Sequence, residues 1–170
     1  MTSSNHRPSN HRLRRTSAAA AILLSAAVAC SPTDGSAAVT VPSPSAEVAG
    51  YCKAFHKELP EKVIEDVERR EASPDSPYTA AWGDPAIVLR CGIDRPAEVG
   101  DPNSHGVEVN GVGWVVDDRG EDGLRFITMY REAYVELVVP ASYHADAGIL
   151  VEFAKPVART IPKSLDDPKF

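Results

Sequence analysis

The stretch that decides the fold is Leu124–Val139, LRFITMYREAYVELVV. Residues 124–130 and 133–139 each alternate apolar and polar side chains, which is typical of a β-strand with one buried face. Only two residues separate these segments, so we expect the two strands to pair antiparallel. Pro140 should end the second strand, because proline lacks the N–H that a strand ladder needs.

Further strands are predicted on the N-terminal side of this pair. Residues 86–91 form an apolar run after a turn-forming WGDP, with Ile87, Leu89 and Cys91 expected on one face and Val88 and Arg90 on the other. Asn110-Gly111, between residues 106–109 and 112–116, predicts a hairpin, because both central positions of such a turn need positive φ.

Helices are predicted at both ends of this strand-rich region. Residues 47–59 carry apolar side chains at helical spacing, and Pro60 would suit the first turn of a second helix over 60–72. Residues 73–85 and 93–104 are rich in proline, glycine or aspartate and predict loops, and 146–161 returns to helical spacing. The expected fold is therefore α+β, an antiparallel sheet of about five strands with N- and C-terminal helices packed on one face.

The N-terminal segment has the pattern of an export signal. Residues 1–29 contain four arginines and no acid, and end in an apolar run of about 12 residues, too short for the ~20 that span a membrane. Ala27-Val28-Ala29-Cys30 resembles the lipobox of bacterial lipoproteins, which predicts lipidation of Cys30 with fatty acyl groups such as palmitate. Ordinary cleavage after Ala29 is the alternative, and Arg14-Arg15 leaves open whether export is general or twin-arginine.

The rest of the chain divides into a tether, one domain and a tail. Residues 30–46 comprise the lipidated cysteine and a Ser/Pro-rich segment predicted to be a disordered tether. Residues 47–162 are expected to form a single domain, and 163–170 a C-terminal tail. Without residues 1–29 the chain has 18 − 4 = 14 basic and 24 acidic residues, a net charge of −10, which argues against a nucleic-acid partner.

Two cysteines remain once Cys30 is acylated. In an oxidising compartment the even pair Cys52 and Cys91 predicts a disulfide. Two alternatives are weaker: a zinc site, in which Cys52 and His56 at i, i+4 are joined by Cys91, and a reactive Cys91 thiolate. The second is disfavoured because Arg90 and Cys91, adjacent in a strand, point to opposite faces.

No catalytic motif is visible, so we expect a protein that is not an enzyme and has no cofactor or metal. The segment 142–146 holds serine, histidine and aspartate, but neighbours in sequence rarely meet at triad geometry, and a helix cap is the better interpretation. The acidic turn 117–123 lacks the spacing of a calcium loop. The candidate binding residues are Trp82, Arg90 and Trp114, although core packing is the default for both tryptophans.

Three motifs carry a resemblance to a known family. They are W-G-x-P-x-x-x-L-R-C-G at Trp82–Gly92, V-N-G-V-x-W at Val109–Trp114 and R-x-x-Y-V-E-L-x-V-P at Arg131–Pro140. With the lipobox, they resemble the actinobacterial lipoproteins of domain-of-unknown-function family 3515 over about residues 48–162. The resemblance implies a location and a fold, but no reaction and no catalytic residues.

These observations together predict a protein lipid-anchored on the extracytoplasmic face of the cell membrane. Its domain is expected to bind a cell-envelope component, either an envelope protein or a cell-wall component. The alternative is an enzyme of envelope metabolism with an unrecognised site. A pocket lined by Arg90, Arg131, Glu136 or His144 would favour that alternative.

Overall fold

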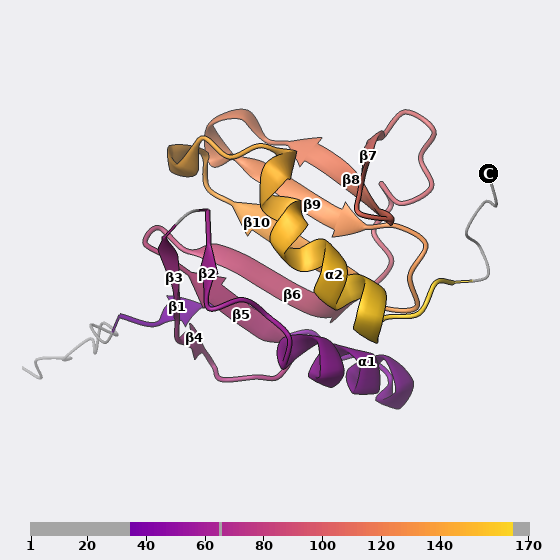
Figure 1. The fold of residues 1–170 in the computed structure, drawn as a ribbon, viewed down its shortest axis with the longest axis horizontal. Helices are drawn as coiled ribbons and strands as arrows, with labels where there is room; N and C mark the ends of the chain where they lie inside the picture. The colour runs from indigo at the N-terminus through magenta and orange to yellow at the C-terminus, as the bar shows by residue number, and fades with distance from the viewer. Residues whose placement is uncertain (1–34, 65, 165–170) are drawn as a thin grey trace, which may run out of the picture. The chain divides into compact units, whose positions relative to one another are not determined.

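Eight strands form one antiparallel sheet in the computed structural model of the protein, in the order β2-β3-β5-β6-β10-β9-β8-β7 (Figure 1). The structure describes residues 35–64 and 66–164, which fall within one compact unit. The predicted export signal and the Cys30 lipidation site lie outside the described residues. No helix in the described part of the chain is long and apolar enough to cross a membrane.

The elements follow one another along the chain with short connections. The strands of the large sheet are β2 Lys62–Val63, β3 Val67–Arg70, β5 Thr79–Trp82, β6 Ile87–Ile93, β7 His105–Val109, β8 Val112–Asp118, β9 Leu124–Thr128 and β10 Tyr134–Val139. A separate parallel pair consists of β1 Ala37–Ala38 and β4 Ala72–Ser73. The helices are α1 Ala46–His56 and α2 Val151–Thr160, with 3₁₀ turns η1 Gly120–Asp122, η2 Ala141–Tyr143 and η3 Ala147–Leu150.

The strands predicted from alternation are confirmed. β9 and β10 pair antiparallel, with Glu136 opposite Ile127, and β10 ends at the residue before Pro140. β7 and β8 form the predicted hairpin, in which Asn110 and Gly111 have φ of 48° and 77°. The apolar pattern of residues 124–139 and the Asn110-Gly111 turn therefore predict the centre and one edge of the sheet.

The predicted second helix over 60–72 is wrong. This segment forms the hairpin β2–β3, with Lys62 opposite Glu68. Val63 is buried in the main core, and Arg69 pairs with Trp82 of β5. The free edge of β5 accepts β3 as a neighbouring strand, so tertiary pairing overrides a helical spacing that three β-branched residues support only weakly.

The predicted loop 73–85 also contains a strand. β5 occupies Thr79–Trp82, and all four of its residues are buried. Because β2, β3 and β5 were not predicted, the sheet has eight strands rather than about five. The coarse description, an antiparallel sheet with a few helices, is confirmed.

The main core lies between one face of the sheet and the two helices. α2 lies across this face, and α1 packs against α2 and β6 near one end of the sheet (Figure 1). Ile87, Leu89 and Cys91 all point into this core, as predicted for β6. The disulfide between Cys52 of α1 and Cys91 of β6 is present and ties the first helix to the sheet.

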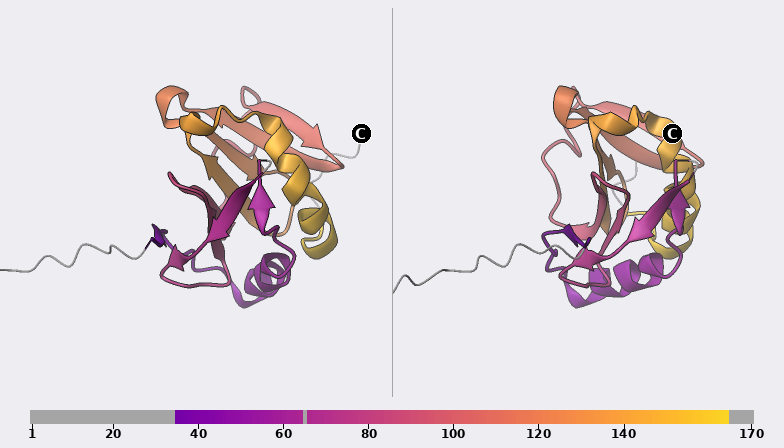
Figure 2. Two further views of the ribbon diagram at one scale, coloured as in Figure 1. Left: turned by 60° about the vertical axis from the view of Figure 1, so that its left-hand side comes forward. Right: turned by 90° about the vertical axis from the view of Figure 1, so that its left-hand side faces the viewer.

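The other face of the sheet is partly covered by the chain that precedes α1, which we call the strap, residues 37–45. Figure 2 shows β1 and β4 on the side of the sheet away from α2. Ala37 and Val39 are buried against Ala81 of β5, and Ser45 caps α1 by accepting a hydrogen bond from the N–H of Val48. The prediction of a disordered tether is therefore wrong for residues 37–45, because Ala37 and Val39 pack against the sheet.

Candidate functional site

The two tryptophans proposed as binding residues are core residues. Trp82 and Trp114 are both 0% exposed. The indole N–H of Trp82 donates to the carbonyl of Pro60, 3.0 Å away, and the ring meets Phe153 of α2 edge to face. Trp114 Nε1 makes no hydrogen bond to any described residue, but it is shielded by the main core. Neither ring can contact a partner at the surface, which corrects the binding interpretation.

Arg90 meets a buried carboxylate on the face of the sheet away from the helices. Arg90 on β6 lies directly opposite Glu136 on β10, so both side chains rise from the same face. Arg90 Nε and Nη2 each lie 2.5 Å from Glu136 Oε2. Glu136 is only 2% exposed. The guanidinium therefore neutralises a carboxylate that would otherwise be buried at high cost.

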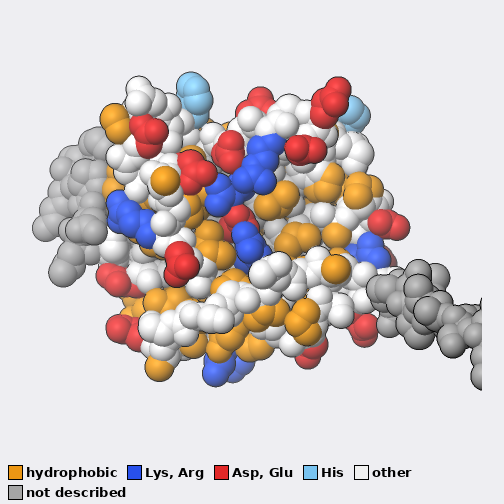
Figure 3. Space-filling model, turned by 180° about the vertical axis from the view of Figure 1, so that it is seen from behind, with side chains coloured by type: hydrophobic (Ala, Val, Ile, Leu, Met, Phe, Trp, Pro, Cys, Tyr) orange, Lys and Arg blue, Asp and Glu red, His pale blue; other side chains and the backbone are white. Residues whose placement is uncertain are grey.

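A second arginine completes the coordination of Glu136. Arg125 Nε donates to Glu136 Oε1 at 2.6 Å, and Arg125 Nη1 donates to Glu98 at 2.8 Å. Burial opposes the charge of Arg125, but its hydrogen bonds with Glu136 and Glu98 outweigh burial and raise its pKa. Figure 3 shows the basic side chains gathered with acidic ones in the middle of this face.

The Arg90–Glu136–Arg125 cluster borders a depression of about 450 Å³, with Pro42 and Ser43 of the strap on its rim. Its central guanidinium groups are matched by carboxylates of the protein itself. We therefore assign this cluster a structural role. It holds β6, β9 and β10 in register on the face that has no helix.

The remaining residues named for an enzymatic pocket do not converge on Arg90 and Glu136. Arg131 is buried and donates to the carbonyls of Ile161 and Gly111. His144 follows η2 and borders a different hollow of about 160 Å³. The pocket that would have favoured an enzyme is thus not formed by these four side chains.

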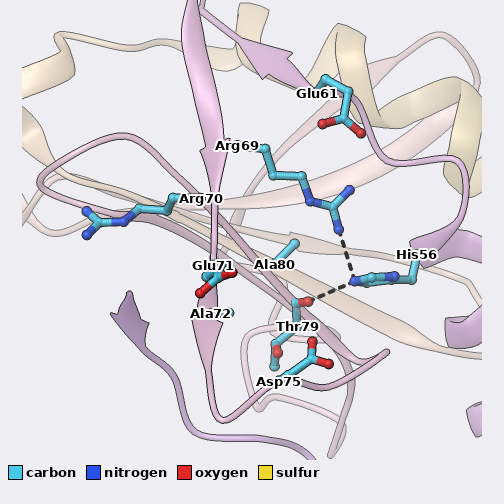
Figure 4. A pocket seen from close by; sticks show the side chains of 9 residues that line it. All are labelled: His56, Glu61, Arg69, Arg70, Glu71, Ala72, Asp75, Thr79 and Ala80. Carbon is cyan, nitrogen blue, oxygen red and sulfur yellow. Dashed lines mark hydrogen bonds between the residues drawn. The ribbon is translucent and has the colours of Figure 1, made fainter. Parts of the chain in front are cut away.

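A different hollow brings together residues that no sequence motif groups into one site. It has a volume of about 380 Å³ and is lined by His56, Glu61, Arg69, Arg70, Glu71, Ala72, Asp75, Thr79 and Ala80 (Figure 4). We call it the His56 hollow. Its walls come from the end of α1, from β3 and β4, and from the start of β5.

The hollow exists because β3 and β5 overlap over only part of their length. Arg69 and Arg70 pair with Trp82 and Ala81, and no strand of this ladder continues opposite Thr79. The free carbonyl of Thr79 instead faces His56 from the last turn of α1, with His56 Nε2 3.1 Å from Thr79 O. The disulfide at Cys52, one helical turn earlier, fixes this end of α1 against the sheet.

Arg69 is the second partner of the imidazole. Arg69 Nη2 lies 3.0 Å from His56 Nε2, and Figure 4 shows the two side chains pointing toward one another. The Arg69 guanidinium also lies over the ring of buried Trp82, 5.8 Å from its centroid. The buried Trp82 ring therefore supports the Arg69 guanidinium from below through a cation–π contact.

One nitrogen of His56 cannot satisfy both neighbours. A guanidinium only donates hydrogen bonds and a carbonyl only accepts them. If Nε2 carries a proton, it donates to Thr79 O and repels Arg69; if it carries none, it accepts from Arg69 and faces the lone pairs of Thr79 O. Burial lowers the pKa of His56, and the charge of Arg69 lowers it further, against smaller opposing effects of Thr79 and Asp75.

Arg69 has no carboxylate partner among the described residues. Within residues 35–64 and 66–164, its side chain makes no ion pair, and its one hydrogen bond is to His56. Glu61, Glu71 and Asp75 line the same hollow but are exposed to solvent. Arg70, by contrast, donates to the carbonyls of Gly35 and Gly83 and lies 3.4 Å from Asp84. A half-buried guanidinium whose one hydrogen bond to a described residue is with an imidazole can accept an anionic ligand.

Sequence reasoning did not find this site. His56 was considered only as a zinc ligand with Cys52 and Cys91, and the disulfide removes both thiolates from that role. Arg69 lies in the segment 60–72, for which the sequence predicts a helix that does not form. Recognition of β3 as a strand would have been the one signal, since it places Arg69 and Arg70 on opposite faces.

Comparison with known proteins identifies the family. The family model described as "Protein of unknown function (DUF3515)" matches residues 16–165, so the chain belongs to this family. The resemblance of the three sequence motifs to domain-of-unknown-function family 3515 is thereby confirmed. No curated protein and no solved structure matches the chain.

Proposed function

We propose that the protein is a lipoprotein, acylated at Cys30 and held on the extracytoplasmic face of the cell membrane. Its domain binds a cell-envelope component, either a protein or a cell-wall component, through the His56 hollow. The basic and apolar N-terminal pattern supports export, and the Cys52–Cys91 disulfide is typical of an oxidising compartment.

The observation that carries the binding role is the state of Arg69. Its guanidinium borders a hollow of about 380 Å³ and makes no ion pair with a described residue. Most half-buried cations in proteins are paired, because desolvation without compensation is costly. Of the described residues that line the hollow, none is a serine or a cysteine. Binding therefore suits this lining better than acyl transfer.

The short segment between Cys30 and the strap limits how far the domain can stand from the membrane. Among the described residues, Ala37 is the first that is buried against the sheet. Seven peptide units separate it from Cys30, and a fully extended chain of that length spans at most about 25 Å. The partner is therefore expected at or near the membrane surface rather than deep in the cell wall.

Photo-crosslinking in intact cells tests this function. A photoreactive amino acid replaces Ala72, which lines the hollow, or Val151, which is 51% exposed on α2 and serves as the control position. We expect a specific crosslinked product from position 72, absent from position 151 and lost when Cys30→Ala releases the protein from the membrane. The same product from both positions, or none from position 72, would contradict the proposal.

A further inference from the structure

In the His56 hollow, two hydrogen bonds of His56 Nε2, one with Arg69 and one with Thr79 O, exclude each other. His56 Nε2 lies 3.0 Å from Arg69 Nη2 and 3.1 Å from Thr79 O. Without a ligand, the better state is the neutral ring that accepts from Arg69, because two adjacent cations in a half-buried site repel each other. In that state the carbonyl of Thr79 has no hydrogen bond from the ring.

An anion at Arg69 reverses this preference. A negative group on the guanidinium removes the repulsion that keeps His56 neutral. The ring can then carry hydrogen at Nε2, through a change of tautomer or by taking up a proton, and donate to Thr79 O. Arg69 Nη2, no longer needed by the ring, is free to donate to the anion. Each of the polar groups His56, Arg69 and Thr79 O then has a partner.

We propose that the His56 hollow binds a single oxyanion, a carboxylate or a phosphate of the partner, at Arg69, while His56 Nε2 changes from accepting a hydrogen bond from Arg69 to donating one to Thr79 O. This proposal rests on the binding function proposed above and names the ligand chemistry of the same site. Glu61, Glu71 and Asp75 line the hollow and disfavour a ligand with several negative charges. The remainder of the ligand is therefore expected to be neutral or cationic.

The charged groups around His56 fit this assignment. Arg69 approaches from β3, Asp75 from the segment before β5, and Glu61 from the segment between α1 and β2. Arg70 and Glu71 lie at the end of β3, where Arg70 is occupied by the carbonyls of Gly35 and Gly83. Burial and Arg69 lower the pKa of His56 in the ligand-free protein, and an anion beside Arg69 offsets the second of these effects. Any proton that His56 takes up on binding makes the affinity fall as pH rises, because binding and protonation are linked.

Isothermal titration calorimetry tests the proposal on the full lipidated chain purified in detergent. The probes are sodium acetate, a planar carboxylate, and sodium sulfate, a tetrahedral oxyanion that does not titrate near neutral pH. Measurement in two buffers of different ionisation enthalpy gives the number of protons taken up on binding. We expect at least one anion to bind. Proton uptake on binding assigns a charged His56 to the complex, and binding without uptake assigns the neutral tautomer with hydrogen on Nε2. Binding of acetate assigns a carboxylate ligand, and binding of sulfate assigns a phosphate ligand.

Three variants separate the roles of the residues. Arg69→Gln is expected to weaken anion binding by about tenfold or more, since a charged hydrogen bond is lost. Arg159→Gln removes the same charge from an exposed arginine on α2 and should change the affinity by less than about twofold. His56→Gln should still bind the anion, but without proton uptake. Arg69→Lys keeps the cation and, if Arg69→Gln does not fold, should bind with intermediate affinity.

The proposal is overturned if neither anion binds, if Arg69→Gln and Arg69→Lys both bind like the natural protein, or if any proton uptake survives in His56→Gln. Its failure is distinguishable from failure of the proposed function. A specific crosslink from position 72 with no anion binding leaves the binding function standing and removes the oxyanion. Anion binding with no crosslinked partner leaves the oxyanion site standing and removes the proposed binding function in cells.

Discussion

Arg90 on β6 and Glu136 on β10 stand directly opposite each other, and both oxygens of the buried Glu136 carboxylate are held by arginines. This pair lies on the face of the sheet opposite the helices. On this face, which the strap covers only in part, arginines from two neighbouring strands neutralise one buried carboxylate. The proposed ligand site is the His56 hollow, where Arg69 makes no ion pair with a described residue.

Removal of the Glu136 carboxylate should destabilise the fold strongly. Glu136→Gln leaves two guanidinium groups without their shared counter-ion, and loss of one partner of a buried pair costs about 3–5 kcal/mol. Urea denaturation measures the change in the free energy of unfolding. Glu98→Gln, at the exposed end of the same cluster, should cost less than about 1 kcal/mol. Equal costs for the two substitutions would contradict the assignment of Glu136 as the centre of the cluster.

The disulfide, which ties α1 to the sheet, should contribute substantially to the free energy of unfolding. Cys52 and Cys91 are 39 residues apart in sequence, and the chain-entropy estimate for a loop of this size is about 4 kcal/mol. The double substitution Cys52→Ala, Cys91→Ala is expected to lower the free energy of unfolding by roughly that amount. Thiol labelling of protein taken from the native envelope gives an independent check. Free thiols at both positions would show that the bond does not form there.

Gly92 tests the packing of the strap against the disulfide. Gly92 has φ of +84°, and an added Cβ would lie 2.8 Å from Pro44 Cβ and 3.3 Å from Cys52 Sγ. Gly92→Ala should therefore destabilise by more than about 1 kcal/mol. Gly50→Ala, in α1 with open space around it, should stabilise by about 0.5–1 kcal/mol. Both changes are measured by thermal and urea unfolding, and a neutral Gly92→Ala would mean that the strap does not pack as described.

The stability of the domain should depend on pH through His56. Its pKa is lowered in the folded protein, so the unfolded chain binds the proton more readily below its own pKa of about 6.5. The contribution of this group is fully present above that pH and is lost as pH falls toward the folded pKa. We expect the free energy of unfolding to fall from pH 7.5 to 5.5 by more in the natural protein than in His56→Gln. An identical decrease in both would remove His56 from the pH response.

The sequence predicts the parts of the fold that depend on local pattern. The alternation in residues 124–139, the Asn110-Gly111 turn and the two faces of β6 are all confirmed. The hairpin β2–β3 was missed, because Val63, Ile64 and Val67 fit helical spacing as well as strand spacing. Pairing with the edge of β5 selects the strand over the helix, and β5 itself lies in a proline-rich segment that the sequence predicts to be a loop.

The candidate site depends on that missed hairpin. The direction of Arg90 away from the core was predictable from strand alternation, but its partner Glu136 depends on the register of two strands that are far apart in sequence. His56 and Arg69 meet only because β3 ends where α1 packs against the sheet. No local pattern encodes that meeting.

The most direct test of the account is the yield of the crosslink from position 72 in cells that carry Arg69→Gln. If the His56 hollow binds the partner through Arg69, the yield should fall by about tenfold or more relative to the natural background. It should be unchanged in the matched Arg159→Gln background. An unchanged yield in Arg69→Gln cells with equal protein levels would contradict the central claim, that Arg69 in this hollow holds the partner.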